Sequence, residues 1–286
     1  TKTAEFKVNK KTLTPQFTVS NKVYDGTKTV NVTKQTISGI VGTDDVSMVV
    51  GKTAKYSSSN VGTYTVTFSG LSLTGTKSSN YALSTTSVSL SSKITAKELT
   101  ATYAGGTITY GQTPITTVNV TGFISGESAA NAAGYTAPTV TITNTSANTT
   151  GYTITPTGGK ATNYTFKYVS GKLIINPKSI TSSDVKSALD TTSYTYNGTA
   201  RTPGVTVTDG TTKLVKGTDY TVTYTNNTNA GTATVTIKGT GNYSGTKTLT
   251  FTIKKVTLTV SGTSNSKPYD GNTTATGSEP TLTGAV

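Results

Sequence analysis

The chain lacks several of the residues on which protein chemistry most often depends. Its 286 residues include no cysteine, no histidine and no tryptophan, one methionine and a single arginine, Arg201. Without cysteine there can be no disulfide, no thiolate ligand for zinc and no thiol nucleophile. Without histidine there is neither the usual general base near neutral pH nor the commonest metal ligand. These absences exclude most familiar catalytic and metal sites.

Apolar and charged residues are both scarce. Hydrophobic residues make up 32% of the chain and charged residues 13%, whereas globular proteins contain about 45–50% apolar residues. Disordered chains share the low apolar content, but they are usually highly charged and poor in aromatic residues. Here there are 16 tyrosines, and alternating Thr, Val and Ile are typical of short β-strands separated by turns rich in Gly, Asn and Ser. We therefore predict a folded, all-β protein with small cores.

No long apolar run is present. None approaches the roughly 20 residues that a membrane-spanning helix needs, and no signal peptide opens the chain. If the parent protein is exported, its signal and anchor are expected to lie outside these residues.

The net charge is strongly positive, at +13. Such a balance favours anionic partners, among them nucleic acid, wall polymer and sulfated glycan. The lysines are scattered rather than clustered, however, and a lone arginine argues against specific phosphate or base recognition. Solubility and charged strand edges that discourage aggregation are the simpler interpretation.

A seven-residue junction recurs four times along the chain. Its pattern is apolar, x, x, Lys, x, apolar, Thr, and its lysines are Lys11, Lys97, Lys178 and Lys254. These lysines lie 86, 81 and 76 residues apart, a period that suits one small domain per repeat. The chain is therefore predicted to be a tandem array.

The repeat divides the chain into five parts. Three whole β modules are expected over residues 13–96, 97–177 and 178–254. Residues 1–12 are expected to be the last strand of a preceding module, and residues 255–286 the first part of a further one. Because half a sandwich buries too little surface to be stable alone, we expect both terminal parts to be completed by neighbouring modules or by copies of the same protein.

Two segments have a composition that suits helices. Residues 182–189 read Ser-Ser-Asp-Val-Lys-Ser-Ala-Leu, which predicts a short capped helix. Residues 126–134 are rich in alanine and are expected to form either a turn of helix or a loop. Elsewhere apolar alternation predicts strands, including one at Val140 and Ile142, and a strong hairpin over residues 220–237.

Recurring turns resemble known repeat families. Val23-Tyr24-Asp25-Gly26-Thr27, together with Gly42-Thr43-Asp44-Asp45-Val46, resembles the YDG repeat of large bacterial surface proteins. Leu99-Thr100-Ala101 with Ile108-Thr109-Tyr110-Gly111 resembles the MBG (mostly β, glycine-rich) repeat. The first two modules are thus similar to two families that occur in tandem arrays.

The third module resembles another surface repeat. Tyr196-Asn197-Gly198, Gly217-Thr218-Asp219-Tyr220 and Gly241-Asn242-Tyr243 are similar to motifs of Ig-like repeats in surface proteins of Gram-positive gut bacteria. Together these resemblances imply an exported adhesin or fibre protein at the bacterial cell surface or wall, whose repeats act as a stalk. They bring no catalytic residues with them.

The acidic residues offer no clear catalytic or metal site. An enzyme without His or Cys would need paired carboxylates, but most of the acidic side chains lie beside Gly, Thr or Ser, where turns and caps explain them. Asp44-Asp45 is the best candidate for calcium, although no D-x-D-x-D-G loop is present and a solvated loop is the simpler interpretation. The candidates considered are Asp44, Asp45, Asp184, Asp190, Asp209, Asp219 and Asp270.

Tyrosine, threonine and lysine suggest three further hypotheses. Tyr24, Tyr110, Tyr196 and Tyr269 recur beside a turn in each module, so they are expected to pack within or between modules rather than to bind glycan. Thr-x-Thr alternation suggests ice binding, but threonine is also a common solvent-facing β-residue. A Lys–Asn cross-link is conceivable, and it would need a buried carboxylate beside the pair.

The sequence therefore predicts an all-β array of small Ig-like β-sandwich modules, with β-grasp-like modules containing a short helix as the alternative. Its expected function is that of stalk or spacer repeats of an exported cell-surface adhesin or fibre, without catalysis, cofactor or metal. Expected partners are neighbouring modules or copies of the same protein. The alternative is direct binding of an anionic host or wall glycan; the binding residues are unknown. We expect no specific nucleic acid and no membrane insertion in these residues.

Overall fold

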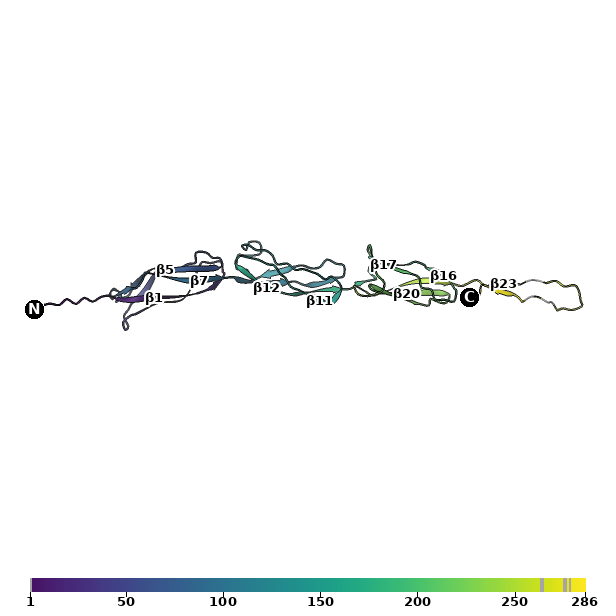
Figure 1. Cartoon of the computed structure of the whole chain (residues 1–286), viewed down its shortest axis with the longest axis horizontal. Helices are drawn as coiled ribbons and strands as arrows, with labels where there is room; N and C mark the ends of the chain where they lie inside the picture. The colour runs from purple at the N-terminus through teal and green to yellow at the C-terminus, as the bar shows by residue number, and fades with distance from the viewer. Residues whose placement is uncertain (1, 263–264, 275–276, 278) are drawn as a thin grey trace. The chain divides into compact units, whose positions relative to one another are not determined.

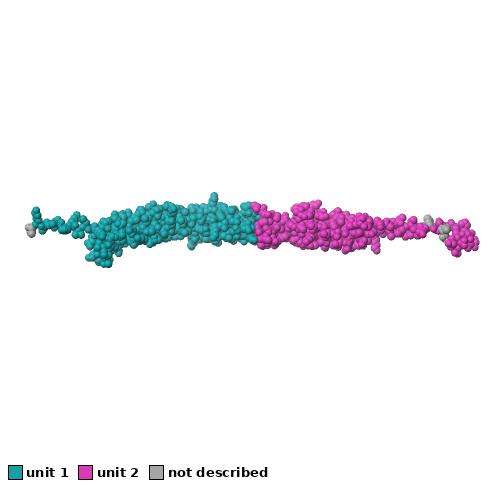
Figure 2. Space-filling view, turned by 60° about the horizontal axis from the view of Figure 1, so that its bottom comes forward, with its two compact units in different colours: residues 1–105, 116–142, 153–172 teal, residues 106–115, 143–152, 173–286 magenta. Residues whose placement is uncertain are grey.

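A computed structural model describes residues 2–262, 265–274, 277 and 279–286. Its elements are β-strands and one 3-10 turn, η1 (Ser78–Asn80), and no α-helix occurs among these residues. The chain divides into two compact units, residues 1–105, 116–142 and 153–172 in one and residues 106–115, 143–152 and 173–286 in the other (Figure 2). The all-β prediction is confirmed.

The first segment, residues 11–95, forms two sheets, with β1 in one and β2, which follows it after one residue, in the other (β1, β5 and β7 are labelled in Figure 1). β1 lies between β3 and β6 in one sheet, and the other has the order β2-β7-β5-β4. On β1, alternate side chains including Leu13 and Phe17 are buried, and Phe17 stacks on Phe68 of β5 with ring centroids 4.2 Å apart. The strands are β1 (Lys11–Ser20), β2 (Lys22–Val23), β3 (Asn31–Ser38), β4 (Ser47–Lys52), β5 (Gly62–Thr74), β6 (Tyr81–Leu83) and β7 (Ser87–Thr95).

The second segment, residues 97–176, repeats this plan. Its sheets have the orders β10-β8-β12 and β11-β13-β9, so the first strand, β8, and the second, β9, again lie in different sheets. The strands are β8 (Lys97–Tyr103), β9 (Gly106–Thr109), β10 (Val118–Thr121), β11 (Asn148–Ile154), β12 (Tyr164–Val169) and β13 (Gly171–Asn176).

Two expectations for the second segment are now decided. The strand expected at Val140 and Ile142 is absent, since pairing there is limited to an isolated bridge between Thr139 and Thr157. Residues 126–134 form a loop of successive turns rather than a helix. This loop places Glu127 at the end of the second segment that contacts the first segment.

The third segment, residues 178–254, contains the predicted hairpin, in which β19 pairs antiparallel with β20. Its three sheets have the orders β14-β21, β15-β17-β18 and β16-β22-β20-β19. The strands are β14 (Lys178–Ser179), β15 (Val185–Leu189), β16 (Ser193–Thr195), β17 (Val205–Asp209), β18 (Thr212–Lys213), β19 (Tyr220–Thr225), β20 (Gly231–Gly239), β21 (Tyr243–Ser244) and β22 (Thr246–Lys254).

The helix predicted at residues 182–189 is wrong. Val185 begins strand β15, which pairs antiparallel with β17, and its side chain is buried in the core with Val207. Pairing with a distant strand therefore outweighs the local capping pattern. The β-grasp-like alternative, which required this helix, falls with it, whereas the Ig-like sandwich stays a prediction.

The fourth segment consists of β23 (Thr259–Ser261) and β24 (Thr281–Thr283), which pair antiparallel. Gly284 follows β24 as Gly39 follows β3 and Gly122 follows β10, all with positive φ. A Cβ atom at each would meet a backbone carbonyl of the opening strand, Thr257, Thr12 and Glu98 respectively. Leu258 therefore takes the place of Leu13 and Leu99.

The first three segments share one feature of their pairing. In each, a strand near the start runs parallel to the last strand, as β2 with β7, β9 with β13 and β16 with β22. The last strand then leads almost directly into the next segment, because one residue separates β7 from β8 and another separates β13 from β14.

Candidate functional sites at the segment junctions

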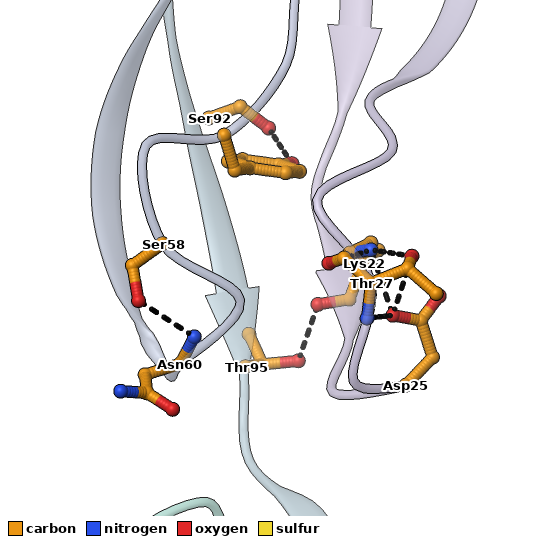
Figure 3. A network of polar contacts seen from close by, with 8 residues as sticks. Lys22, Asp25, Thr27, Ser58, Asn60, Ser92 and Thr95 are labelled. Atoms are coloured by element: carbon orange, nitrogen blue, oxygen red, sulfur yellow. Dashed lines mark hydrogen bonds and ion pairs between the residues drawn. The ribbon is translucent and has the colours of Figure 1, made fainter.

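The first Tyr-Asp-Gly turn, residues 22–27, is held by a buried lysine. Lys22 is 7% exposed, and its Nζ donates to Asp25 Oδ1 at 2.7 Å and to the Thr27 carbonyl and hydroxyl oxygens at 2.8 Å each (Figure 3). The Tyr56 ring lies 5.5 Å from this ammonium group. Although partial burial opposes it, these bonds and those from Thr27 hold the pKa of Asp25 below its usual value. The ion pair thus fixes the turn that presents Tyr24.

Tyr24 meets the second segment through a shared carboxylate. Its hydroxyl donates to Glu127 Oε1 at 2.6 Å, and the Tyr164 hydroxyl donates to Glu127 Oε2 at 2.6 Å. The Tyr24 and Tyr164 rings lie edge to face with centroids 5.5 Å apart. Burial, and next the bond to Glu127, raise the pKa of Tyr24 to about 12 and also raise the pKa of Tyr164. Both phenols therefore stay protonated donors at neutral pH.

Backbone contacts complete this first junction. Asn163 Oδ1 accepts from the Val61 N–H at 2.9 Å, and Asn163 Nδ2 donates to Asn60 Oδ1 at 3.0 Å. Gly26 approaches Ile124 so closely that a Cβ atom would lie 2.9 Å from Ile124 Cδ1. The junction therefore combines aromatic packing, a carboxylate that bridges two segments and an asparagine side chain that accepts a hydrogen bond from the backbone of the first segment.

The second junction repeats the edge-to-face tyrosine pair and the asparagine contact of the first, but its carboxylate, Asp209, binds side chains of the third segment alone. Tyr110 lies edge to face on Tyr243 with centroids 5.6 Å apart, and Asn242 Oδ1 accepts from the Ala147 N–H at 2.7 Å. The Tyr243 hydroxyl donates to Asp209 Oδ2 at 3.0 Å. Burial and this bond raise the pKa of Tyr243. Tyr110 and Asn242 thus correspond to Tyr24 and Asn163.

A lysine replaces the second tyrosine hydroxyl at this junction. Lys178 Nζ donates to Asp209 Oδ1 at 2.6 Å and also binds Asp184. The bonds to Asp184 and Asp209 raise the pKa of Lys178. Lys22 and Lys178 therefore bind aspartate and not the asparagine side chain that a Lys–Asn cross-link would require.

Among the residues that the structure describes, Tyr196 and Tyr269, the other two recurrent tyrosines, have no aromatic partner at a junction. Tyr196 lines a shallow pocket with Ala230, Val256 and Leu258. Tyr269 is 99% exposed, although Lys267 Nζ lies 3.0 Å from Asp270 Oδ1 in the same arrangement as Lys22 and Asp25. The prediction that these tyrosines pack between modules is confirmed for Tyr24 and Tyr110.

The predicted calcium candidate is used within the first segment. Asp44 Oδ2 accepts from the Tyr81 hydroxyl at 2.5 Å, and Asp45 Oδ2 accepts from the Thr76 N–H at 2.9 Å and from its hydroxyl at 3.0 Å. Among the described residues, no group of three acidic side chains is placed to hold a metal ion. The loop is therefore explained by its own hydrogen bonds.

Sequence reasoning missed the residues that receive the junction tyrosines. Glu127 lies in residues 126–134, for which the sequence predicts either a turn of helix or a loop, and Asn242 is recognisable only as part of Gly241-Asn242-Tyr243. The available signal was the repeated Asn-Tyr at Asn80-Tyr81, Asn163-Tyr164 and Asn242-Tyr243, each at the start of a strand. In every case the tyrosine hydroxyl donates to a carboxylate.

No helix among the described residues is long and apolar enough to cross a membrane.

Comparison with known proteins assigns two of the segments. No curated protein matches the chain. Residues 9–88 match the model of the YDG domain, and residues 99–174 match that of the MBG domain (YGX type). The chain therefore carries a YDG domain followed directly by an MBG domain.

Proposed function

We propose that the chain is a spacer portion of an exported bacterial surface protein, an adhesin or a fibre, and that it holds its modules in defined register. The tandem YDG and MBG domains support this, because they fit repeat modules of surface proteins. The third segment serves as a further module of the same array, and neighbouring modules are its partners.

The observation that carries the proposal is the first junction. Tyr24, Glu127 and Tyr164 place two edge-to-face rings and two charge-assisted hydrogen bonds between successive segments. Such hydrogen bonds contribute roughly 1.5–3 kcal/mol each when buried, and aromatic pairs add about 0.5–1.5 kcal/mol. Because one residue separates β7 from β8, a junction of this kind leaves little freedom for bending.

We propose no catalysis for the chain. Tyr24, Tyr164 and Tyr243 have raised pKa values and remain neutral, so they are poor bases and poor nucleophiles near pH 7. Lys178 stays protonated between two carboxylates and is likewise no nucleophile. Of the charged groups at the junctions, Glu127 holds two segments together, whereas Lys178 and Asp209 stabilise the third segment itself.

Distance measurements across the first junction test the proposal. The chain has no cysteine, so two can be introduced at the exposed positions Thr65 and Lys167 and spin-labelled for pulsed dipolar spectroscopy. We expect a narrow distance distribution that broadens in the variant Tyr24→Ala/Glu127→Ala and not in the control Tyr269→Ala. An equally broad distribution in the parent chain would exclude a positional spacer. Antibody labelling of intact cells of the source organism tests the surface location.

A second candidate function is supported by the charge. A net charge of +13 favours an anionic glycan or wall polymer, whose binding would release counterions and weaken steeply with added salt. Titration with heparin and polyphosphate at increasing ionic strength measures this. Binding that saturates at defined stoichiometry in physiological salt would favour a ligand-binding module over a spacer.

A further inference from the structure

The third segment has an edge strand that lacks the usual protection against pairing. β19 forms one edge of the sheet β16-β22-β20-β19, and its sequence, Tyr-Thr-Val-Thr-Tyr-Thr, contains no charged residue, glycine or proline. Edge strands expose unpaired N–H and C=O groups, and proteins place lysines or irregularities there to prevent association. In the described part of the chain, each of the other edge strands of five or more residues carries such a residue: Lys34 in β3, Lys52 in β4, Gly151 in β11, Lys167 in β12 and Lys186 in β15.

The direction of the backbone groups along β19 follows from its neighbour β20. The two strands pair antiparallel without a bulge, with Tyr220 opposite Gly239. The Gly239 N–H donates to the carbonyl of Gly245, which directly precedes β22 on the far side of β20. Tyr220 and Gly239 are therefore a non-hydrogen-bonded pair. Because the pattern alternates along the strand, the N–H and C=O groups of Tyr220, Val222 and Tyr224 point away from β20.

Two of these three residues have backbone groups available for a further strand. The Tyr220 carbonyl accepts from the Gly217 N–H at 2.8 Å, so its outward side is in use. For Val222 and Tyr224, no backbone partner occurs on that side among the described residues. The strand itself is held in place, because the Tyr224 hydroxyl donates to the Pro203 carbonyl at 2.6 Å. The middle of β19 is thus an ordered edge with free donors and acceptors.

The sequence of β19 is complementary to itself in one antiparallel register. When Thr223 of two copies meet at a two-fold axis, Val222 of each copy lies opposite Tyr224 of the other. The free N–H and C=O groups of these two residues then bond to one another on both sides of the axis. A register centred on Val222 would need the Tyr220 carbonyl, which is already bonded, and a shift by one residue would place threonines opposite apolar side chains.

The charge of the chain favours this edge over its other edges as a contact between copies. A net charge of +13 opposes the approach of two copies. In the register centred on Thr223, threonine lies opposite threonine and valine opposite tyrosine, so the paired strands contribute no like charges. The remaining repulsion acts over longer distances, and added salt should screen it.

We propose that β19 is a lateral contact between two copies of this chain, which pair antiparallel across Thr223. The two four-stranded sheets then form one continuous sheet, whose exposed face carries the threonines of β19, β20 and β22. The same strand is used by both copies, so the contact is isologous and closes as a dimer. The pairing residues are not among those that form the segment junctions, so this contact goes beyond the proposed spacer and does not depend on it.

Sedimentation velocity of the intact chain at concentrations up to the millimolar range tests this dimer. We expect a monomer–dimer equilibrium that strengthens with added salt and that Thr223→Lys weakens at least about fivefold, because two like charges then lie opposite each other at the axis. The matched control Thr250→Lys adds the same charge to the same exposed face, on β22, and should leave association unchanged. Mixing Thr223→Lys with Thr223→Glu should restore the dimer. Equal association constants for Thr223→Lys and Thr250→Lys overturn the proposal.

Disulfide capture tests the register directly, since the chain has no cysteine of its own. Opposed residues of a non-hydrogen-bonded antiparallel pair have Cα atoms about 4.5 Å apart, within the range of about 4.4–6.8 Å that a disulfide spans. Under mild oxidation, Thr223→Cys should therefore form a covalent dimer in much higher yield than the control Thr250→Cys. Equal yields, together with a monomer at all concentrations, overturn the proposal. The spacer proposal would still stand if the distance distribution across the first junction is narrow.

Discussion

The two Tyr-Asp-Gly turns, residues 22–27 and 267–272, contain the same lysine–aspartate ion pair, but the tyrosine of the first is buried and that of the second is exposed. Lys22 and Lys267 each bind the aspartate three residues later, at 2.7 and 3.0 Å. Tyr24 is 5% exposed and touches Glu127 and Tyr164, whereas Tyr269 is 99% exposed. The conformation of the turn is therefore encoded in a few adjacent residues, while the burial of its tyrosine depends on side chains more than a hundred positions away.

Of the changes considered, removal of the tyrosine ring should give the largest difference in the free energy of unfolding between the two turns. Tyr24→Ala deletes a buried ring from the core that spans the first junction, and truncation of a buried aromatic side chain costs about 3–5 kcal/mol. Tyr269→Ala should leave the free energy of unfolding unchanged. Urea unfolding followed by tyrosine fluorescence and circular dichroism measures both; equal effects of the two changes would show that Tyr24 contributes nothing at the junction.

Alkaline pH should weaken the packed turn alone. The pKa of Tyr24 rises from 10.0 to about 12, so between these values the unfolded chain loses a proton that the folded chain retains. Stability is complete below about pH 10 and declines as pH rises toward 12, by up to about 1.4 kcal/mol per pH unit for one group. Tyr24→Phe should reduce the decline and Tyr269→Phe should not. Identical pH profiles for the parent chain and Tyr24→Phe would contradict this assignment.

A carboxylate that accepts from two tyrosines should matter more than one that accepts from a single tyrosine. Glu127→Gln leaves two buried tyrosine hydroxyls competing for one acceptor oxygen, which should cost about 2 kcal/mol. Asp44→Asn affects a single tyrosine hydroxyl and should cost less. Thermal unfolding of the two variants gives the comparison, and a larger loss for Asp44→Asn would contradict the role of Glu127 as the bridge between the first two segments.

The smallest expected difference is between alanine substitutions at the matched glycines of the two turns. Both Gly26 and Gly271 have φ near +77°, so alanine at either position costs roughly 1–2 kcal/mol for the left-handed backbone. Only at Gly26 would the new Cβ atom also meet Ile124, at 2.9 Å; nothing lies within 4 Å of it at Gly271. Gly26→Ala should therefore broaden the distance distribution across the first junction, and Gly271→Ala should leave it narrow.

Alternation was sufficient to predict the hairpin of β19 and β20, although the strand that it predicted at Val140 and Ile142 is absent. Val235 and Ile237 are buried on β20 as expected, and the recurrent residues Tyr24 and Tyr110 lie at junctions. Glu127 could not be identified in this way, because its partner Tyr24 lies 103 positions earlier and its own segment forms irregular turns. The helix expected at residues 182–189 failed for a related reason, since Val185 is held by pairing with β17 across the intervening chain.

The parallel pairing of an early strand with the last strand has a mechanical consequence. In the first three segments the chain enters beside one strand and leaves at the far end of its parallel neighbour, as in β2 with β7 and β16 with β22. Tension applied to the two ends of such a segment slides these strands past each other, so the hydrogen bonds between them are stretched together in shear instead of opening one after another. Resistance to pulling therefore resides in a few residue pairs, among them Lys22 with Ile94 and Tyr194 with Ile253.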